Sequence, residues 1–243
     1  MQLSRWSSDK VIIIAFAMMH LEVGAQVPLP LEADLNAIIA GHPSGTTFML
    51  EAGVHRGQEL QLREGDTLIG EEGAKLSGAE LLVGWRFEDP FWVHDGPHAK
   101  AVVDYDESAR PWELRARWPH DLFVDNVPIV QKYASILVKD EKSWAYDYDA
   151  DKIYVRFNPE GHIMELSGLC RYGLRTRDSG VTVRNVHFDK FATTGQSGAV
   201  ELGSHAIIEN CIVSGSHATG MRISSNTQVR QCRFSWNGLA GLH

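Results

Sequence analysis

Residues 183–188 read VRNVHF, and the same six-residue phrase returns as IENCIV at 208–213 and as VRQCRF at 229–234. The steps between the three copies are 25 and 21 residues. An apolar–polar–apolar phrase at 200–202 recurs 21 residues later at 221–223. Repeats at this period indicate stacked units in which each short strand lies on its equivalent in the next unit. The chain is therefore predicted to be all-β, a parallel β-helix with coils of about 21 residues.

The charge balance limits the class of partner. The 243-residue chain is long enough for one large domain or two small ones, and its net charge is −8. An acidic chain gives no electrostatic support to a nucleic-acid partner, so none is expected. A polyanionic substrate would need a local basic patch.

The first 25 residues have the pattern of a secretory signal peptide. Arg5 and Lys10 precede an apolar run at 11–19, and small residues follow at 23–25. The run is too short to span a bilayer. We expect cleavage after Ala25 and a secreted, periplasmic or cell-surface protein that makes no membrane contact afterwards. A membrane anchor is the alternative.

The remaining chain divides into three parts. Residues 26–84 are predicted to form an N-terminal cap and the first coils, with a capping helix at 31–40 and short strands thereafter. Residues 85–166 lose the repeat and are rich in aromatic side chains, which indicates a β-rich insertion with a hairpin at 143–157. Regular coils occupy 167–243. They stop within a repeat, which predicts a C-terminally truncated solenoid and leaves open whether the catalytic centre lies beyond residue 243.

Three motifs carry a family resemblance. They are GTTFMLEAGVH at 45–55, GDTLIG at 65–70 and the Asn185 and Asn210 repeats. With them, residues 31–243 resemble secreted right-handed parallel β-helix proteins of the pectate-lyase-like superfamily. The stretch DLFVD at 121–125, together with the 143–157 hairpin, resembles the β insertion of some β-helix glycoside hydrolases.

The resemblance implies a right-handed solenoid and a carbohydrate partner. That superfamily contains polysaccharide lyases, glycoside hydrolases and non-catalytic adhesins, so fold analogy alone does not choose between them. The expected function is an exported carbohydrate-active protein that acts on an extracellular or cell-wall polysaccharide or oligosaccharide as a glycoside hydrolase or a polysaccharide lyase. The alternative is a non-catalytic glycan-binding or surface protein. A monomer is expected in either case.

The candidate catalytic residues are Glu201, Arg222 and His243. Each is the polar member of the recurring phrase, so the three should project outward from consecutive coils. Together they could abstract a proton beside a uronate carboxylate and stabilise the resulting negative charge. The alternative is a surface ladder of charges. Four carboxylates near the regular coils offer no pair at equivalent repeat positions for a hydrolase: Asp178, Asp189, Glu201 and Glu209.

The candidate substrate-binding residues are Arg175, Arg177 and Trp236. The two arginines belong to a basic stretch that extends from Arg171 to Lys190 and either faces an anionic glycan or is neutralised by nearby acids. Trp236 is expected in an exposed loop, where its ring could stack on a sugar. The tryptophans of the insertion could line a subsite or form its core.

The histidines are not expected to form a column along the repeat, whereas two of the cysteines are. His187, His205 and His217 lie at different repeat phases, so they are interpreted as turn or surface residues. The cysteines are Cys170, Cys211 and Cys232. Cys211 and Cys232 should stack on adjacent coils, as buried thiols or as a disulfide. No metal site is expected from the sequence. Because lyases of the resembling superfamily often use Ca²⁺, that ion is kept as an alternative cofactor. The acidic turn at 147–151 is interpreted as a solvated hairpin turn.

Overall fold

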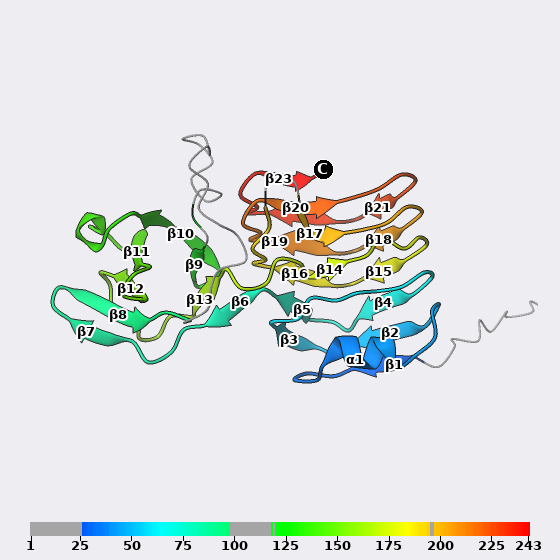
Figure 1. The fold of residues 1–243 in the computed structure, drawn as a ribbon, viewed down its shortest axis with the longest axis horizontal. Helices are drawn as coiled ribbons and strands as arrows, with labels where there is room; N and C mark the ends of the chain where they lie inside the picture. The colour runs from blue at the N-terminus through cyan, green and yellow to red at the C-terminus, as the bar shows by residue number, and fades with distance from the viewer. Residues whose placement is uncertain (1–25, 98–117, 119, 195–196) are drawn as a thin grey trace, which may run out of the picture.

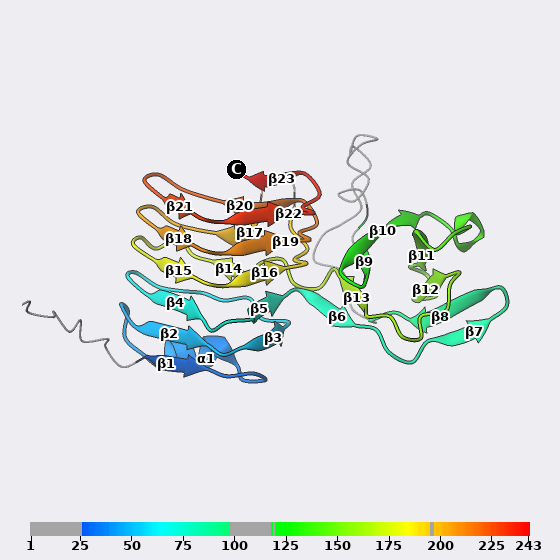
Figure 2. The same cartoon turned by 180° about the vertical axis from the view of Figure 1, so that it is seen from behind.

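The computed structural model describes residues 26–97, 118, 120–194 and 197–243. The expected signal peptide lies outside these residues. The chain forms three parallel sheets, here called sheets A, B and C, which stack into a solenoid, and a lateral sheet of eight strands beside it (Figures 1 and 2).

The strands of the three solenoid sheets follow in spatial order. Sheet A contains β1 (Val27–Leu29), β2 (Thr47–Leu50), β4 (Thr67–Gly70), β15 (Thr182–Arg184), β18 (Ile207–Glu209) and β21 (Gln228–Arg230). Sheet B contains β3 (Gly53–Arg56), β5 (Ala74–Ser77), β16 (His187–Asp189), β19 (Ile212–Ser214) and β22 (Arg233–Ser235). Sheet C contains β14 (Leu174–Arg175), β17 (Gly198–Glu201), β20 (Thr219–Arg222) and β23 (Ala240–Leu242).

The lateral sheet is mostly antiparallel and has its own core. Its strands, in spatial order, are β6 (Ala79–Leu81), β13 (Met164–Ser167), β9 (Asp121–Val124), β10 (Val127–Lys132), β11 (Ser143–Asp147), β12 (Lys152–Val155), β8 (Phe91–Asp95) and β7 (Arg86–Glu88). A short 3₁₀ helix, Ser135–Leu137, precedes β11. The predicted hairpin is confirmed, because β11 and β12 pair antiparallel across the 147–152 turn. Trp144 of β11 is fully buried in the core of the lateral sheet.

The solenoid core is built from like residues in register. In sheet B, Leu76, Phe188 and Val213 pair in consecutive strands and are fully buried. β4 pairs directly with β15, and β5 with β16, so the stack continues although the lateral sheet separates these strands in sequence. One hydrophobic cluster consequently extends from Leu29 to Met221.

The repeated asparagines form a corner. Asn185, Asn210 and Gln231 all have positive φ, a conformation that asparagine tolerates better than most side chains. The Asn210 amide donates a hydrogen bond of 2.9 Å to Asn185 Oδ1 in the neighbouring coil. These two side chains therefore form an amide ladder between adjacent coils.

The N-terminal helix, α1 (Leu35–Ala40), is shorter than expected. The Asp34 side chain accepts a 3.0 Å hydrogen bond from Ala37 N, so it caps the helix at that point. Glu32 has a φ of 62°, which excludes it from a right-handed helix. Leu35 and Ile39 are buried in the solenoid core.

The cysteines are free thiols in the structure. Cys211 is 1% exposed, and Cys232 lies in the next coil because the flanking residue pairs are in register. This agrees with the interpretation of stacked thiols.

Candidate functional site

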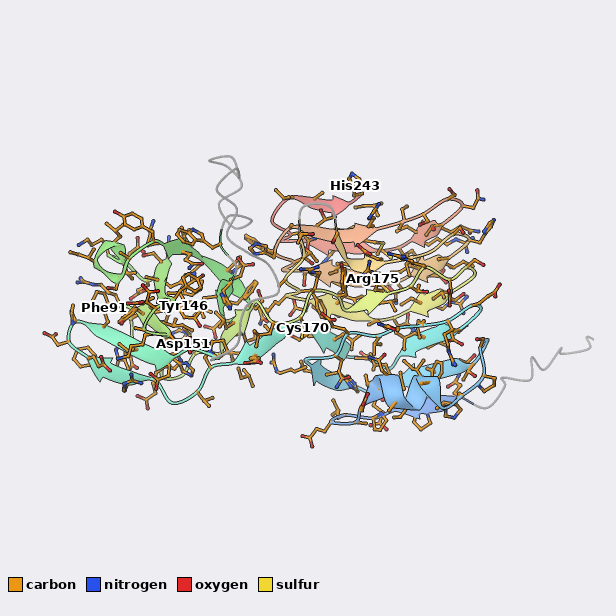
Figure 3. All side chains as sticks on the ribbon, in the orientation of Figure 1. Phe91, Tyr146, Asp151, Cys170, Arg175 and His243 are labelled. Atoms are coloured by element: carbon orange, nitrogen blue, oxygen red, sulfur yellow. The ribbon has the colours of Figure 1, made fainter. Side chains whose placement is uncertain are left out.

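The candidate catalytic residues lie in one column on sheet C. Arg175 pairs with Glu201, and Glu201 with Arg222. His243 follows Leu242, whose partner is Met221, so it continues the column. Val200 and Met221, which precede Glu201 and Arg222, are buried, whereas Arg222 is exposed. In the last coil both Leu242 and His243 are exposed. Figure 3 shows Arg175 and His243 at different heights of the stack.

Glu201 is already engaged. Its carboxylate forms a 3.2 Å ion pair with Arg175 Nε and accepts a 3.3 Å hydrogen bond from Gly198 N. The Glu201 side chain is 14% exposed, whereas that of Arg175 is 42% exposed. The Arg175 guanidinium also lies 4.7 Å from the centre of the Tyr172 ring. Glu201 is thus held in place, and Arg175 keeps part of its surface available to a ligand.

A recess of about 600 Å³ opens beside the base of this column. Leu60 forms an isolated bridge with Leu174, which places Gln61 next to Arg175 and Arg63 next to Arg177. Helix α1 forms the opposite wall. We call this the arginine recess, and its lining is Asn36, Ile39, Ala40, Gln61, Leu62, Arg63, Arg175, Thr176, Arg177 and Asp178.

The arginine recess is cationic. Three guanidinium groups and one carboxylate, that of Asp178, line it. Arg63 is fixed by a 2.8 Å hydrogen bond from Nη2 to Ile39 O and by a 3.5 Å contact between Nε and Asp66 Oδ2. A pocket of this size with few fixed polar groups suits a small ligand or one sugar of a polymer. Its guanidinium groups offer hydrogen-bond donors to an anion, although Glu201 and Asp66 pair with two of the three.

Trp236 lies outside this arrangement. It follows β22 in the left-handed conformation, with a φ of 58°, and is 65% exposed. It does not line the arginine recess. The structure therefore brings together Arg175, Arg177 and Glu201 but not the tryptophan.

The basic stretch is divided rather than continuous, and for Lys190 the second alternative, neutralisation by nearby acids, holds. Lys190 does not face a glycan, because it is 1% exposed and points into the lateral sheet. Its ammonium donates to Glu165 Oε2 at 2.5 Å and to Asn126 Oδ1 at 2.7 Å, and lies 3.0 Å from Asp189 Oδ2. Its positive charge is therefore neutralised by Glu165 of the lateral sheet and by Asp189 of the solenoid.

Further charges surround this lysine. Arg56 Nη2 lies 2.8 Å from Glu165 Oε1, and Lys75 Nζ lies 3.4 Å from Asp189 Oδ2. Burial alone would raise the pKa of Asp189, but the ammonium of Lys190 and a hydrogen bond from Ser214 hold that pKa below its usual value. We call this set the junction network, and its members are Arg56, Lys75, Glu165, Asp189 and Lys190.

His217 also differs from expectation. It was interpreted as a turn or surface residue, but it is 3% exposed, and its Nδ1 lies 2.9 Å from Asp121 Oδ2 of β9. The pair joins a solenoid turn to the lateral sheet. Neighbouring His120 is also 3% exposed, and burial lowers its pKa to about 4. These contacts join residues about a hundred positions apart, so no repeat pattern in the sequence could reveal them.

A small cavity of about 60 Å³ lies beside His120. His120 and Gln131 line it, and among the described residues neither His120 ring nitrogen nor Gln131 Oε1 has a hydrogen-bond partner. Buried polar atoms normally have partners, and the volume accommodates about two water molecules. We expect water in this cavity.

The described part of the chain contains neither a cluster of potential metal ligands nor a helix that could span a membrane. No group of three or more potential metal-ligating side chains occurs in that part of the chain. No helix there is long and apolar enough to cross a membrane.

Comparisons with known proteins support the fold. Residues 172–243 match the family model described as "Right handed beta helix region", which covers less than half of the chain. The solved structure of XylC in complex with xylose is similar with a TM-score of 0.57 and 17% identity, covering 78% of this chain and 39% of that chain. A structure described as a glycoside hydrolase is similar with a TM-score of 0.49 and 11% identity, covering 78% of this chain and 58% of that chain. A search of the curated proteins finds no match.

This chain therefore spans less than two thirds of the length of either structure. At these identities the likeness concerns the fold alone. Together with the parallel sheets and the match to the family model, it confirms the predicted architecture: residues 26–243 contain a right-handed parallel β-helix with a lateral sheet beside it.

Proposed function

We propose that the chain is an exported, carbohydrate-active β-helix protein that binds an acidic polysaccharide along sheet C and acts on it as a polysaccharide lyase or glycoside hydrolase. The observation that carries the proposal is the arginine recess, where Arg63, Arg175 and Arg177 meet at the base of the Glu201–Arg222–His243 column. Guanidinium groups bind carboxylates through paired hydrogen bonds. XylC, which shares the fold, was solved with a sugar, but the ligand class proposed here rests on the recess.

The column supplies groups suited to a lyase. In this proposal the arginines bind the uronate carboxylate, Glu201 takes the proton beside it, and Arg222 stabilises the charge that develops as the bond to the leaving sugar oxygen breaks. A hydrolase would instead need a second carboxylic acid facing Glu201. Of the described residues that line the arginine recess, Asp178 is the single acid, and Glu201 is not among them.

One observation favours a non-catalytic glycan-binding protein as the second candidate. Glu201 is ion-paired with Arg175 and 14% exposed, so a base at this position must first exchange its partner. A binding protein needs no such exchange. Measuring product formation distinguishes the two: unsaturated uronate absorbance indicates a lyase, new reducing ends without that absorbance indicate a hydrolase, and binding without either indicates a binding protein.

Replacing Arg175 with alanine should weaken binding of polygalacturonate by about ten- to a hundredfold, because a charge-assisted hydrogen bond contributes about 1.5–3 kcal/mol. Calorimetry with wild type and variant measures this effect. Arg184→Ala is a matched control: Arg184 also forms a 3.2 Å pair from Nε to a glutamate, Glu209, and is 44% exposed, but it lies on sheet A. Equal losses in both variants would show that general charge, not the arginine recess, binds the polymer.

A further inference from the structure

A second recess, of about 370 Å³, lies on the lateral sheet. Trp85 and Trp92 line it together with Asn158, Glu160 and His162. It shares no lining residue with the arginine recess. Its volume is within the range of small-ligand sites. We call it the tryptophan recess.

Both indole rings are held in fixed positions while part of their surface stays exposed. Trp85 Nε1 donates a 3.2 Å hydrogen bond to Leu82 O, and the ring packs against His94 with 5.2 Å between centroids. Trp92 lies on β8 and packs against Phe87 with 5.5 Å between ring centroids. Neither ring is fully buried. A ligand that stacks on them would therefore cost little side-chain entropy.

Polar groups at the recess are also positioned. His162 Nδ1 lies 2.7 Å from Asp125 Oδ2, and Asn158 Oδ1 accepts a 3.0 Å hydrogen bond from Glu160 N. The side chains of Glu160 and His162 are exposed. Aromatic faces next to exposed carboxylate, amide and imidazole groups match a molecule with an apolar ring face and a rim of hydroxyl groups.

The charge of this recess is the reverse of that of the arginine recess. Glu160 lines it, and Asp125 lies directly behind His162. Two carboxylates oppose an anionic ligand such as a uronate. A sugar without charge satisfies both the aromatic faces and the acidic rim.

We infer that the tryptophan recess is a second glycan-binding site, specific for an uncharged sugar ring. It stands apart from the arginine recess and would position the lateral sheet on a neutral part of a polysaccharide. The inference rests on the lateral sheet alone, so it holds whether or not the solenoid binds anions.

The test is titration of the full chain with oligosaccharides of glucose, mannose and xylose. Tryptophan fluorescence and calorimetry measure the dissociation constant of each. Binding of at least one neutral oligosaccharide is expected, and Trp85→Ala should weaken it about tenfold or more, because the stacking platform is removed. Trp85 contacts the core of the lateral sheet, so Glu160→Ala, a change at an exposed residue, provides a second variant that keeps the fold. It should also weaken binding, by severalfold.

Two controls make the result specific. Tyr133→Ala removes an aromatic ring that is 73% exposed but does not line the recess, and it should leave binding unchanged. Arg175→Ala should also leave neutral oligosaccharide binding unchanged while weakening polygalacturonate. Absence of binding by all three oligosaccharides, or equal affinity in wild type, Trp85→Ala and Glu160→Ala, would overturn the inference.

Discussion

Replacing Lys190 with methionine should lower the free energy of unfolding by about 3–5 kcal/mol, which is the usual cost of removing one partner from a buried ion pair. Methionine keeps an unbranched stem in the same left-handed backbone position, where φ is 59°. The change therefore isolates the ammonium group. Glu165 and Asp189, which are 3% and 4% exposed, would lose their shared buried cation. Urea unfolding followed by tryptophan fluorescence measures the loss.

Lys75→Met is the matched control for this experiment. Lys75 pairs with the same Asp189 at 3.4 Å, but its side chain is 24% exposed. Its removal should cost about 1 kcal/mol or less, because a partly solvated pair is weak. Adding Glu165→Gln to Lys190→Met should not restore stability, because Glu165 still pairs with Arg56 at 2.8 Å after Lys190 is replaced, and the glutamine would remove that pair. If Lys190→Met costs no more than Lys75→Met, the junction network does not fasten the lateral sheet to the solenoid.

The repeats were sufficient to predict the solenoid but not what lies beside it. The phrases at 183, 208 and 229 predict pairs such as Val183 with Ile208, because in a stack each coil repeats the environment of the last. Lys190 occupies the place in its coil that Gly215 and Trp236 occupy in theirs, and all three have positive φ. The next coil has glycine at this position, so a lysine here indicates contacts outside the repeat. Its partners, Asn126 and Glu165, belong to the lateral sheet. No periodicity connects them.

The arginine recess shows the same limit. Arg175 and Arg177 were predicted from the regular coils, whereas Arg63 was not. In its coil, sheet C is reduced to the single bridge between Leu60 and Leu174, so the recurring three-residue phrase is absent. Helix α1, which completes the recess, is unrelated to the repeat as well. Sequence could therefore place the column, but not the concave surface at its base.

Acidification from pH 7 to pH 4 should destabilise the protein, and His120 should contribute on the order of 3 kcal/mol to that loss. Burial lowers the pKa of His120 to about 4, and a repulsive contribution from His217 acts in the same direction, whereas Asp121 and Asp151 oppose it. In the unfolded chain the pKa of this histidine is about 6.5. Each unit of difference corresponds to about 1.36 kcal/mol.

The sign follows from which state binds the proton first. Above pH about 6.5 the ring is neutral in both states, so its burial carries no electrostatic cost. As the pH falls towards 4, the histidine binds a proton in the unfolded state but stays neutral in the folded state. The free energy of unfolding therefore decreases. Below 4 both states are protonated, and the loss levels off. His187, whose pKa burial also lowers to about 4, adds to the slope in the same window.

Substitution of His120 by phenylalanine separates its contribution from the rest. Phenylalanine keeps an aromatic ring against Tyr146 and Tyr148, whose centroids lie 5.0 and 5.8 Å from that of His120, and it removes the titrating group. Urea midpoints at a series of pH values between 7 and 4 should fall less steeply for His120→Phe than for wild type. His205→Gln, a change at an exposed corner histidine, should retain the wild-type slope. If His120→Phe also retains that slope, the proton taken up on unfolding binds elsewhere, and the neutral state of His120 is not what makes the junction sensitive to acid.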